Sequence, residues 1–450
     1  MTYSVEADLI ASLPPGWHHR RLKEVCDVIP SNVDKLSVDG QAAVRLCNYV
    51  DTYKNERITA SIDFMSATAT QAQIERLSLK KGDITITKDS ESPWDIAVPA
   101  FISEDVEGLV CGYHLSKIAP EAGVMDGGYL SWALRSKPVN LQFALAAQGI
   151  TRYGLSSSAL ADGVVPCPPY NQQLAIASYL DAETKRIDGL IEAKSELANL
   201  IEESRWSALG HVLGGLDHAS DLLPTASLFW AQRPAHWSEM RVKFLIDRIE
   251  QGWSPQAESG SAGSDEWGVL KAGACNGGVF REVENKALPP DVIPDPTLEI
   301  RPHDVLMSRG SGSVDLVGSV ALVPDDVRSK LMLCDLMYRI SVDQEIALPE
   351  WYVLTMNSAP IRRQIRLALR GAEGLTRKIS IGEIKDLVVL VPPLAEQRSH
   401  IAKCRTINQR ANEAIEYINS EIALLHELRS ATITDAVLGR IDVRKYMKTE

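Results

Sequence analysis

Two long stretches of the chain have the hydrophobic pattern of helices that pack on other helices. They cover residues 168–213 and 392–438, and in both of them apolar residues recur at alternating a and d positions of a heptad. The seam positions predicted in the first stretch are Leu180, Ile187, Leu190, Leu197 and Ile201, interrupted by Lys194. Those predicted in the second are Ile401, Ala411, Ile415, Ile418, Ile422 and Leu425.

Both stretches begin with a proline pair, Pro168-Pro169 in the first and Pro392-Pro393 in the second. Proline fits at or just before the first turn of a helix and not later, so these pairs mark two helix starts. About 40 residues at about 1.5 Å per residue give a helix about 60 Å long, which needs a partner. We therefore predict that the two helices pair with each other, with Leu190 and Leu197 packed against Ile415–Leu425.

The segments that precede the two helices repeat each other. In unbroken order, PGWHHRRLK (15–23) matches AHWSEMRVK (235–243), KKGDITITKDS (80–90) matches RPHDVLMSRGS (301–311), LVCGYHLSKI (109–118) matches LMLCDLMYRI (331–340), and GITR (149–152) matches GLTR (374–377). The offset drifts only from 220 to 225 residues. Regular matches of this kind indicate one unit written twice.

Short alternating runs, glycine-rich turns and short helical patterns fill each repeat, which is typical of an α+β fold with a mostly antiparallel sheet. We predict two domains of similar fold joined by two long antiparallel helices in a coiled coil, as a pseudo-twofold internal repeat. The expected segments are an N-terminal domain (1–166), a first helical spacer (167–214), a linker (215–232), a C-terminal domain (233–391), a second helical spacer (392–438) and a tail (439–450).

Composition narrows the class of protein. Of the 450 residues 45% are hydrophobic, and we find neither a signal peptide nor an apolar run long enough for a membrane, so we expect a cytoplasmic protein. The 7 cysteines are scattered without a CxxC pair and are typical of buried thiols in a reducing compartment. The net charge of −12 disfavours nucleic-acid binding over the whole surface but permits a local basic face.

Candidate catalytic sequences are weak. Cys167-Pro168-Pro169-Tyr170 approaches the motif with which amino-methyltransferases hold an amine, but a thiol is a poor acceptor there. Ser308–Ser313 is glycine-rich but lacks the Lys-Ser/Thr of a phosphate-binding loop, and neither HExxH nor GxSxG is present. We expect no catalytic residue, no metal site and no cofactor in this chain.

Two equivalent loops, residues 87–94 and 308–313, are rich in hydrogen-bond donors suited to phosphates and base edges. Locally basic segments follow them, with Arg135, Lys137 and Arg152 in the first half and Arg362, Arg363, Arg366, Arg370, Arg377 and Lys378 in the second. The predicted DNA contacts are Lys88, Ser90, Trp94, Arg152, Tyr153, Arg309, Ser311, Ser313, Arg377 and Lys378. We expect the loops to enter the grooves and Arg152, Arg377 and Lys378 to hold phosphates. An ordinary polar hairpin is the alternative.

With these segments in view, the chain resembles a specificity subunit of a type I restriction–modification system over nearly its whole length. The resemblance is carried by the repeated Trp-x₅-Lys starts, GDITITKDSESP, DVLMSRGSGSVDLVGSVALV, the helix starts PPYNQQLAIASYLD and PPLAEQRSHIA, and the closing LGRIDVR. The chain departs from the pattern at Gln172, where the second half has Glu396, and at Ile401, which lies one position later than Ile176.

The resemblance implies a division of labour. Each domain would read one half of a bipartite double-stranded DNA target, while the helices would set the spacing and dock two methyltransferase subunits. S-adenosylmethionine would belong to those partners, and ATP and magnesium to restriction/translocase subunits, in a phage-defence system that methylates DNA. The alternatives are a self-contained DNA adenine methyltransferase and a two-domain scaffold with no DNA role.

Overall fold

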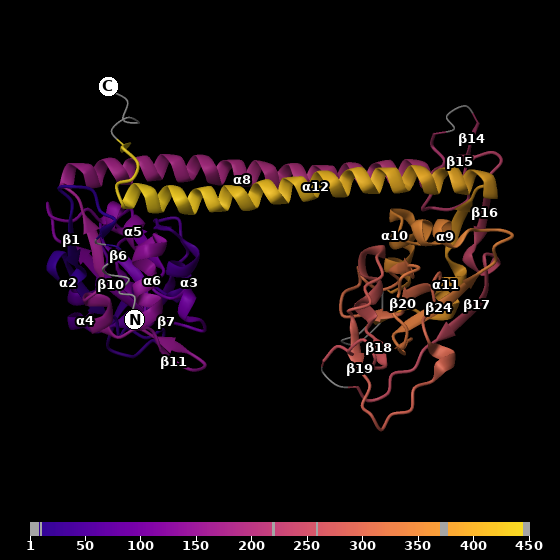
Figure 1. The fold of residues 1–450 in the computed structure, drawn as a ribbon, viewed down its shortest axis with the longest axis horizontal. Coiled ribbons are helices and arrows are strands. Elements are labelled where there is room, and N and C mark those ends of the chain that lie inside the picture. Colours follow the sequence, from indigo (N-terminus) through magenta and orange to yellow (C-terminus); the bar gives the residue numbers. More distant parts are fainter. Residues whose placement is uncertain (1–8, 10, 218–220, 258–259, 370–376, 444–450) are drawn as a thin grey trace. The chain divides into compact units, whose positions relative to one another are not determined.

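The structure, a computed structural model, describes residues 9, 11–217, 221–257, 260–369 and 377–443. The chain divides into two compact units. Unit 1 contains Met1–Ser195 and Asn419–Glu450, and unit 2 contains Glu196–Ile418. Both units combine sheets with short helices and with parts of two long helices (Figure 1), as expected for the predicted α+β class. No helix in the described part of the chain has the length and hydropathy that a bilayer crossing requires.

Unit 1 is built on a five-stranded sheet in the order β2-β10-β6-β8-β4, antiparallel except between β4 and β8. Its central strand β6 has the sequence ITIT and is buried along its whole length, because the sheet is covered on both faces. The strands are β2 (Cys26–Pro30), β4 (Arg57–Ile58), β6 (Ile84–Thr87), β8 (Pro99–Ile102) and β10 (Leu115–Pro120).

Three smaller sheets and a set of short helices complete unit 1. The sheets are β5-β3-β9 (Met65–Ala69, Ala42–Cys47, Leu109–Cys111), β1-β13 (His18–Arg21, Val164–Cys167) and β11-β12-β7 (Gln148–Gly149, Tyr153–Gly154, Asp89–Ser90). The helices are α2 (Leu22–Val25), α3 (Tyr49–Lys54), α4 (Gln71–Leu77), η1 (Pro93–Asp95), α5 (Gly127–Arg135), α6 (Lys137–Ala146) and α7 (Ser157–Ala161).

Unit 2 repeats this order of elements. Its main sheet is β17-β24-β20-β22 (Ile246–Gln251, Met337–Val342, Val305–Ser308, Val320–Leu322). The smaller sheets are β19-β18-β23 (Asn285–Ala287, Gly268–Leu270, Leu331–Met332), β16-β26 (Ser238–Arg241, Val388–Val391), β21-β25 (Gly310–Ser311, Arg377–Lys378) and β14-β15 (Leu222–Pro224, Gln232–Pro234). The helices are η2 (Val242–Phe244), η3 (Ala272–Gly278), η4 (Pro296–Leu298), α9 (Pro349–Met356), α10 (Ala359–Ala368) and α11 (Ile381–Asp386).

The predicted repeat extends to individual hydrogen bonds. The Asp83 carboxylate, just before β6, accepts from the backbone N–H of Lys80 at 2.9 Å, and Asp304, just before β20, accepts from that of Arg301 at 2.9 Å. Asp83 also pairs with Lys117 on β10 at 3.0 Å, and Asp304 pairs with Arg339 on β24 at 3.4 Å. Equivalent strands are therefore tied by equivalent ion pairs.

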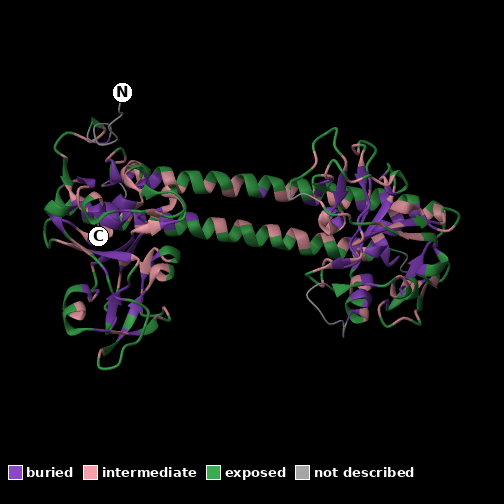
Figure 2. Cartoon of the chain, turned by 90° about the horizontal axis from the view of Figure 1, so that it is seen from below, coloured by how far each residue is buried: buried purple, intermediate pink, exposed green. Residues whose placement is uncertain are grey.

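The two long helices are α8 (Tyr170–Leu213) and α12 (Leu394–Val437), close to the predicted bounds. They are antiparallel within each unit, since numbering rises along one helix as it falls along the other. In unit 1, Asp188 accepts from Arg429 at 2.8 Å, and in unit 2, Asn412 accepts from Arg205 at 2.9 Å. Buried residues gather in the sheets, whereas the middle stretches of α8 and α12 are largely exposed or half-buried (Figure 2).

Each long helix ends at a glycine with a left-handed backbone. Gly215 (φ 65°) follows α8 and Gly439 (φ 68°) follows α12. A Cβ at Gly215 would lie 2.6 Å from Pro234 Cγ, and one at Gly439 would lie 2.5 Å from Pro14 Cγ. Both positions therefore need glycine, for its backbone conformation and for the close approach of a proline.

The structure corrects two predicted seam positions on α8. Leu190 and Leu197 are 40% and 45% exposed, whereas Ile191 and Ala198, one residue later, are half-buried. Together with the buried Ile187 these positions follow a spacing of three and four residues. The predicted heptad was shifted by one residue at these positions. Leu190 and Ile191 are both apolar, so either of them could continue the heptad.

Lys194 does not interrupt the seam but belongs to it. Its ammonium group donates to Glu421 on α12 at 2.7 Å, and both side chains are half-buried. The other predicted seam residues are buried (Leu180, Ile187, Ile401, Ala411, Ile418) or half-buried (Ile201, Ile415, Ile422, Leu425). A polar pair thus occupies a place that periodicity alone assigns to apolar residues.

Candidate nucleic-acid interface

In unit 1 a small sheet joins the predicted loop to the segment that contains Arg152. Strand β7 pairs with β12 in the register Asp89↔Gly154 and Ser90↔Tyr153. The backbone N–H of Leu155 donates to the carbonyl of Lys88 at 2.7 Å and extends this pairing. Residues about 60 positions apart in the chain, Lys88–Ser90 and Arg152–Tyr153, therefore lie next to each other.

Unit 2 makes the same junction. Strand β21 pairs with β25 in the register Gly310↔Lys378 and Ser311↔Arg377. The backbone N–H of Ile379 donates to the carbonyl of Arg309 at 2.9 Å, just as Leu155 donates in unit 1. In both units the donor-rich loop and the following basic segment are thus parts of one small sheet.

The register of these sheets corrects one detail of the repeat. Because Ser90 faces Tyr153 and Ser311 faces Arg377, the counterpart of Arg377 is Tyr153 and not Arg152. The sequence match of GITR (149–152) with GLTR (374–377) had made Arg152 the equivalent of Arg377, which is one residue away from the observed pairing. Most of GLTR, together with Arg370, lies outside the described residues.

Serine hydroxyls fix both loops. Ser90 Oγ accepts from the backbone N–H of Ser92 at 3.3 Å, and Ser311 Oγ accepts from that of Ser313 at 3.2 Å. Ser90 is buried, Ser311 is half-buried and Ser313 is exposed. These local bonds hold the turn of each loop, and they leave Ser313 as the most accessible of the predicted hydroxyl contacts.

Lys88 and Arg309 point back onto the protein. Lys88 Nζ donates to the carbonyl of Ser31 at 2.9 Å and lies 4.9 Å from the centre of the Tyr113 ring. Its pKa is lowered, chiefly because burial disfavours the charged form. Arg309 Nη1 donates to the carbonyl of Asp335 at 3.2 Å, and its guanidinium lies 5.8 Å from the Tyr338 ring. Both cations would have to leave these contacts to reach a DNA groove.

Several arginines of the basic segments also have internal partners. Arg135 donates to the carbonyl of Pro99 at 2.5 Å, and burial lowers the pKa of its guanidinium. Arg362 and Arg366 on α10 bond the backbone carbonyl and the carboxylate of Asp315, each at 2.8 Å. These three arginines thus have partners within the protein, an arrangement that the sequence could not distinguish from phosphate contact. Arg363, Arg377 and Lys378 are exposed.

Arg152 belongs to a three-residue polar cluster that the sequence did not predict. The Asp89 carboxylate accepts from Arg152 Nη2 at 2.8 Å and lies 2.7 Å from Nδ1 of His114. The side-chain exposures are 18% for Asp89, 38% for His114 and 60% for Arg152. The carboxylate thus lies beneath the two other groups. His114 comes from the turn between β9 and β10. The contact between this turn and the loop at Lys88 is not visible in the sequence.

Tyrosine side chains lie beside this cluster. Tyr49 and Tyr53 on α3 stack with ring centroids 5.6 Å apart, and Tyr53 Oη donates to Asp95 at 2.7 Å. Tyr113 meets His114 edge-to-face at 4.8 Å and is largely exposed. Tyrosines beside cationic groups suit contact with sugars, phosphates and base edges. Sequence alone does not single these tyrosines out, because tyrosines are more often core residues.

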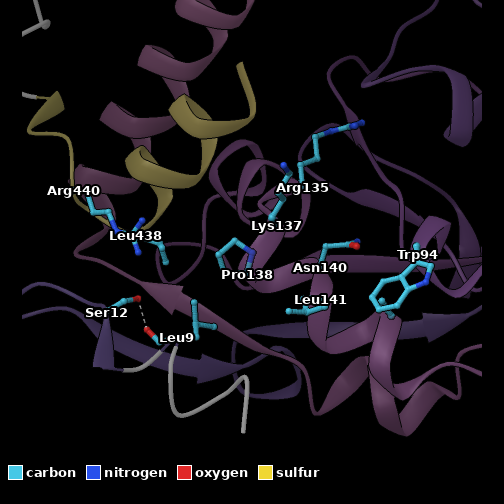
Figure 3. Close-up of a pocket in the computed structure, with 11 residues that line it drawn as sticks. Leu9, Ser12, Trp94, Arg135, Lys137, Pro138, Asn140, Leu141, Leu438 and Arg440 are labelled. Carbon is cyan, nitrogen blue, oxygen red and sulfur yellow. Dashed lines mark hydrogen bonds between the residues drawn. The ribbon is translucent and has the colours of Figure 1, made fainter. Parts of the chain in front are cut away.

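Trp94 lies apart, at one end of a cavity of about 610 Å³ along α6 (Figure 3). Asn140 and Leu141 lie beside its indole ring, and Arg440 lies toward the other end of the cavity. Ser92 positions Trp94 by accepting a hydrogen bond from its backbone N–H at 3.3 Å. The structure therefore brings Trp94 onto α6 rather than into the small sheet.

The weak catalytic candidates have structural explanations. Pro168 and Pro169 precede the first turn of α8, and the carbonyl of Pro168 accepts from Gln173 Nε2 at 2.9 Å. Within the described ranges no group of three or more His, Cys, Asp or Glu side chains could hold a metal ion.

Comparison with known proteins identifies relatives over part of the chain. No protein-family model matches it. The type I restriction enzyme EcoEI specificity subunit of Escherichia coli is 30% identical over 207 residues, which are 46% of this chain and 34% of the relative. The EcoKI specificity subunit of E. coli strain K12 is 20% identical over 279 residues, 62% of this chain and 57% of the relative. The matches thus span about a third to three fifths of the relatives' lengths.

Solved structures share the fold over nearly the whole chain. A chain from a study of complex assembly and conformational transition in the type I restriction–modification system aligns with a TM-score of 0.70, at 18% identity, over 95% of this chain and 99% of its own. The HsdS subunit of Thermoanaerobacter tengcongensis aligns with a TM-score of 0.52, at 18% identity, over 95% and 98%.

Proposed function

We propose that this chain, a homologue of type I restriction enzyme specificity subunits, is a non-catalytic subunit that gives such a complex its DNA sequence specificity. Each sheet-rich unit reads one half of a bipartite double-stranded target. The observation that carries the proposal is the small sheet present in both units, β7-β12 and β21-β25, which joins a donor-rich loop to a basic segment. One chain with two such junctions can contact two DNA segments.

The chemistry of the junctions fits DNA. Arg377 and Lys378 are exposed on β25 and suit phosphate oxygens. Arg152 is the most exposed member of its cluster and suits the same role in unit 1. Phosphate contacts supply affinity for every sequence, whereas groups that reach base edges supply discrimination. In unit 1 the base-edge candidates are Ser90, Tyr153 and the polar cluster, and in unit 2 they are Ser311, Ser313 and Arg309.

The long helices would set the spacing of the half-sites, since α8 and α12 each run from one unit into the other. They also carry large apolar side chains on exposed positions, which isolated soluble proteins usually cover. On α8 these are Leu190, Leu197, Leu200 and Trp206, and on α12 they are Tyr417, Leu424 and Leu428. We assign them to the docking of two methyltransferase subunits. S-adenosylmethionine, ATP and magnesium would be bound by the partner subunits, in the cytoplasm.

The decisive experiment reconstitutes the chain with the methyltransferase of its own system and maps adenine methylation across a host genome. The expected result is a bipartite motif with a fixed gap. A variant that replaces unit 2 residues Arg377 and Lys378 by alanine should reduce methylation at all sites, and the matched control is the exposed Arg398→Ala on α12.

Methylation by the chain alone would instead identify a self-contained methyltransferase. A complex without salt-dependent DNA binding would indicate a scaffold.

A further inference from the structure

The polar cluster Asp89, His114 and Arg152 has no equivalent among the residues of unit 2 that the structure describes. The backbone N–H of Lys88 donates to the carbonyl of His114 at 3.2 Å, and that of Arg309 donates to the carbonyl of Leu336 at 2.8 Å. Leu336 therefore occupies the place of His114. By the same register, Gly310 occupies the place of Asp89.

Unit 2 is tightly packed where unit 1 has the Asp89 carboxylate. A Cβ built at Gly310 would lie 3.0 Å from Lys378 Cγ and 3.3 Å from Leu336 Cδ2. These contacts are tighter than ordinary packing, so an aspartate would displace its neighbours. The two junctions therefore differ in chemistry at two positions, where unit 1 has Asp89 and His114 and unit 2 has Gly310 and Leu336, although their backbones correspond.

The contact with Asp89 determines the tautomer of the His114 ring. A carboxylate only accepts hydrogen bonds, so at 2.7 Å the Nδ1 atom of His114 donates to Asp89. When the ring carries a single proton, Nε2 is therefore the acceptor. The edge-to-face contact with Tyr113 fixes the plane of the ring. No hydrogen bond to Nε2 is formed by any residue that the structure describes. Arg152 lies alongside, with Nη2 3.3 Å from Nδ1.

We propose that His114 is a specificity-determining residue of unit 1, whose Nε2 accepts a hydrogen bond from the exocyclic amino group of one adenine or cytosine in the major groove of the first half-site. Asp89 is its positioning residue, because it fixes which ring nitrogen carries the proton. Arg152 adds a cationic donor for the phosphate beside the same base pair. This inference rests on the proposed DNA-reading function. The exocyclic amines of adenine and cytosine are the major-groove donors that such an acceptor can bind.

The test is a double-mutant cycle between protein and DNA on the reconstituted complex. Once the target is known, each adenine or cytosine of the first half-site is replaced in turn by purine or by pyrimidin-2-one, which lack the exocyclic amine. For the wild type, one such replacement should weaken binding about fivefold, the effect of one lost hydrogen bond. For His114→Ala the same replacement should change binding less than about twofold, with replacements in the second half-site unaffected.

Two isosteric variants separate reading from folding. His114→Gln keeps a polar amide near the Nε2 position, and His114→Asn keeps one only near Nδ1, beside Asp89. Sensitivity to the amine should persist in part in His114→Gln and vanish in His114→Asn. Asp89→Asn should also reduce the sensitivity to the amine. The matched control is His19→Ala, which changes an exposed histidine on β1. Thermal unfolding identifies any variant that fails to fold.

The possible outcomes are distinct. If His114→Ala and the isosteric variants respond to every analogue as the wild type does, His114 reads no amine and the inference is wrong. A uniform loss of affinity on all duplexes would also overturn it, because it indicates a phosphate contact. If the wild-type complex shows no sequence preference at all, the proposed DNA-reading function fails instead.

Discussion

The Gln397 side chain accepts a hydrogen bond from the backbone N–H of Leu348 at 2.8 Å and donates to the carbonyls of Ile346 and Pro392, each at 2.9 Å. Gln173 does the same in unit 1, where it accepts from the N–H of Asp126 at 2.8 Å. Both amides are fully buried. One glutamine thus joins the start of each long helix to the start of a short helix, which is α9 in unit 2 and α5 in unit 1.

Replacing Gln397 by alanine should destabilise unit 2 by about 2–4 kcal/mol, because a buried N–H and two buried carbonyls lose their partners. The measurement is native-state hydrogen exchange resolved by unit. The protection of unit 2 should fall and that of unit 1 should remain, while Gln173→Ala should do the reverse. Gln409→Ala on the exposed face of α12 is the control. Equal effects of the three variants would contradict this role of the buried amides.

The corrected seam predicts opposite behaviour for two neighbouring residues. Ile191→Asp places a charge between α8 and α12 and should cost about 1.5–3 kcal/mol in the stability of unit 1. Leu190→Asp changes an exposed position and should leave stability within about 0.5 kcal/mol, while weakening methyltransferase binding. Chemical denaturation and titration of the partner measure the two effects. A larger stability loss for Leu190→Asp would restore the seam predicted from the sequence.

The cysteines should differ strongly in reactivity. Burial raises the pKa of Cys47 and of Cys334 to about 12, so at pH 8 only about one molecule in ten thousand carries either thiolate. Cys167 is only half-buried and should react first with an aromatic disulfide reagent. Its rate should rise with pH, because burial also raises its pKa. Counting labelled thiols by mass spectrometry, with Cys167→Ser as control, checks this order. Rapid labelling of Cys47 in the folded protein would contradict it.

Arg377 and Arg309 should contribute differently to DNA binding. Arg377→Ala should weaken every sequence alike and lower the slope of log affinity against log salt by about one, as expected for a phosphate contact. Arg309→Ala should selectively damage recognition of the second half-site, because it removes a proposed base-edge donor and also the hydrogen bond to the carbonyl of Asp335 that holds the loop. Titrations on matched and mismatched duplexes at two salt concentrations measure both. An unchanged mismatch profile for Arg309→Ala would remove this loop from the interface.

Matching insertions of seven residues in the middle of α8 and α12 should lengthen the gap in the target. Seven residues preserve the heptad and add about 10 Å of helix, which is about three base pairs of DNA. Methylome mapping should show a longer gap between two unchanged half-sites. A changed half-site would show that the helices do more than set the distance.

Much of the fold could be predicted because the chain contains two versions of its main elements. Asp83 and Asp304, which the repeat matches, form equivalent ion pairs in the two units. The proline pairs marked both helix starts within two residues. The phase of the α8 seam could not be predicted, since Leu190 and Ile191 are both apolar and only contact with α12 separates them. Lys194 was misread because its partner Glu421 is distant in the sequence.

The candidate interface could be located but not detailed. The recurrence of donor-rich loops and basic segments indicated which stretches meet, and β7-β12 and β21-β25 join them. The direction of a side chain depends on partners that periodicity does not reveal. Lys88 therefore turns toward Ser31, and Arg135 toward Pro99. His114 was overlooked because a lone histidine has no visible link in the sequence to Asp89, 25 residues away.

The division of the chain has a consequence for its synthesis on the ribosome. Unit 2 is one continuous segment, but the core of unit 1 includes Ile433, Ala436 and Val437 from the end of α12 and Leu438 directly after it. At about 5–20 residues per second, those side chains emerge last, after all of unit 2 has been made. The first half of the chain to be translated is therefore the last to complete its core, and until then it exposes apolar surface that a chaperone could bind.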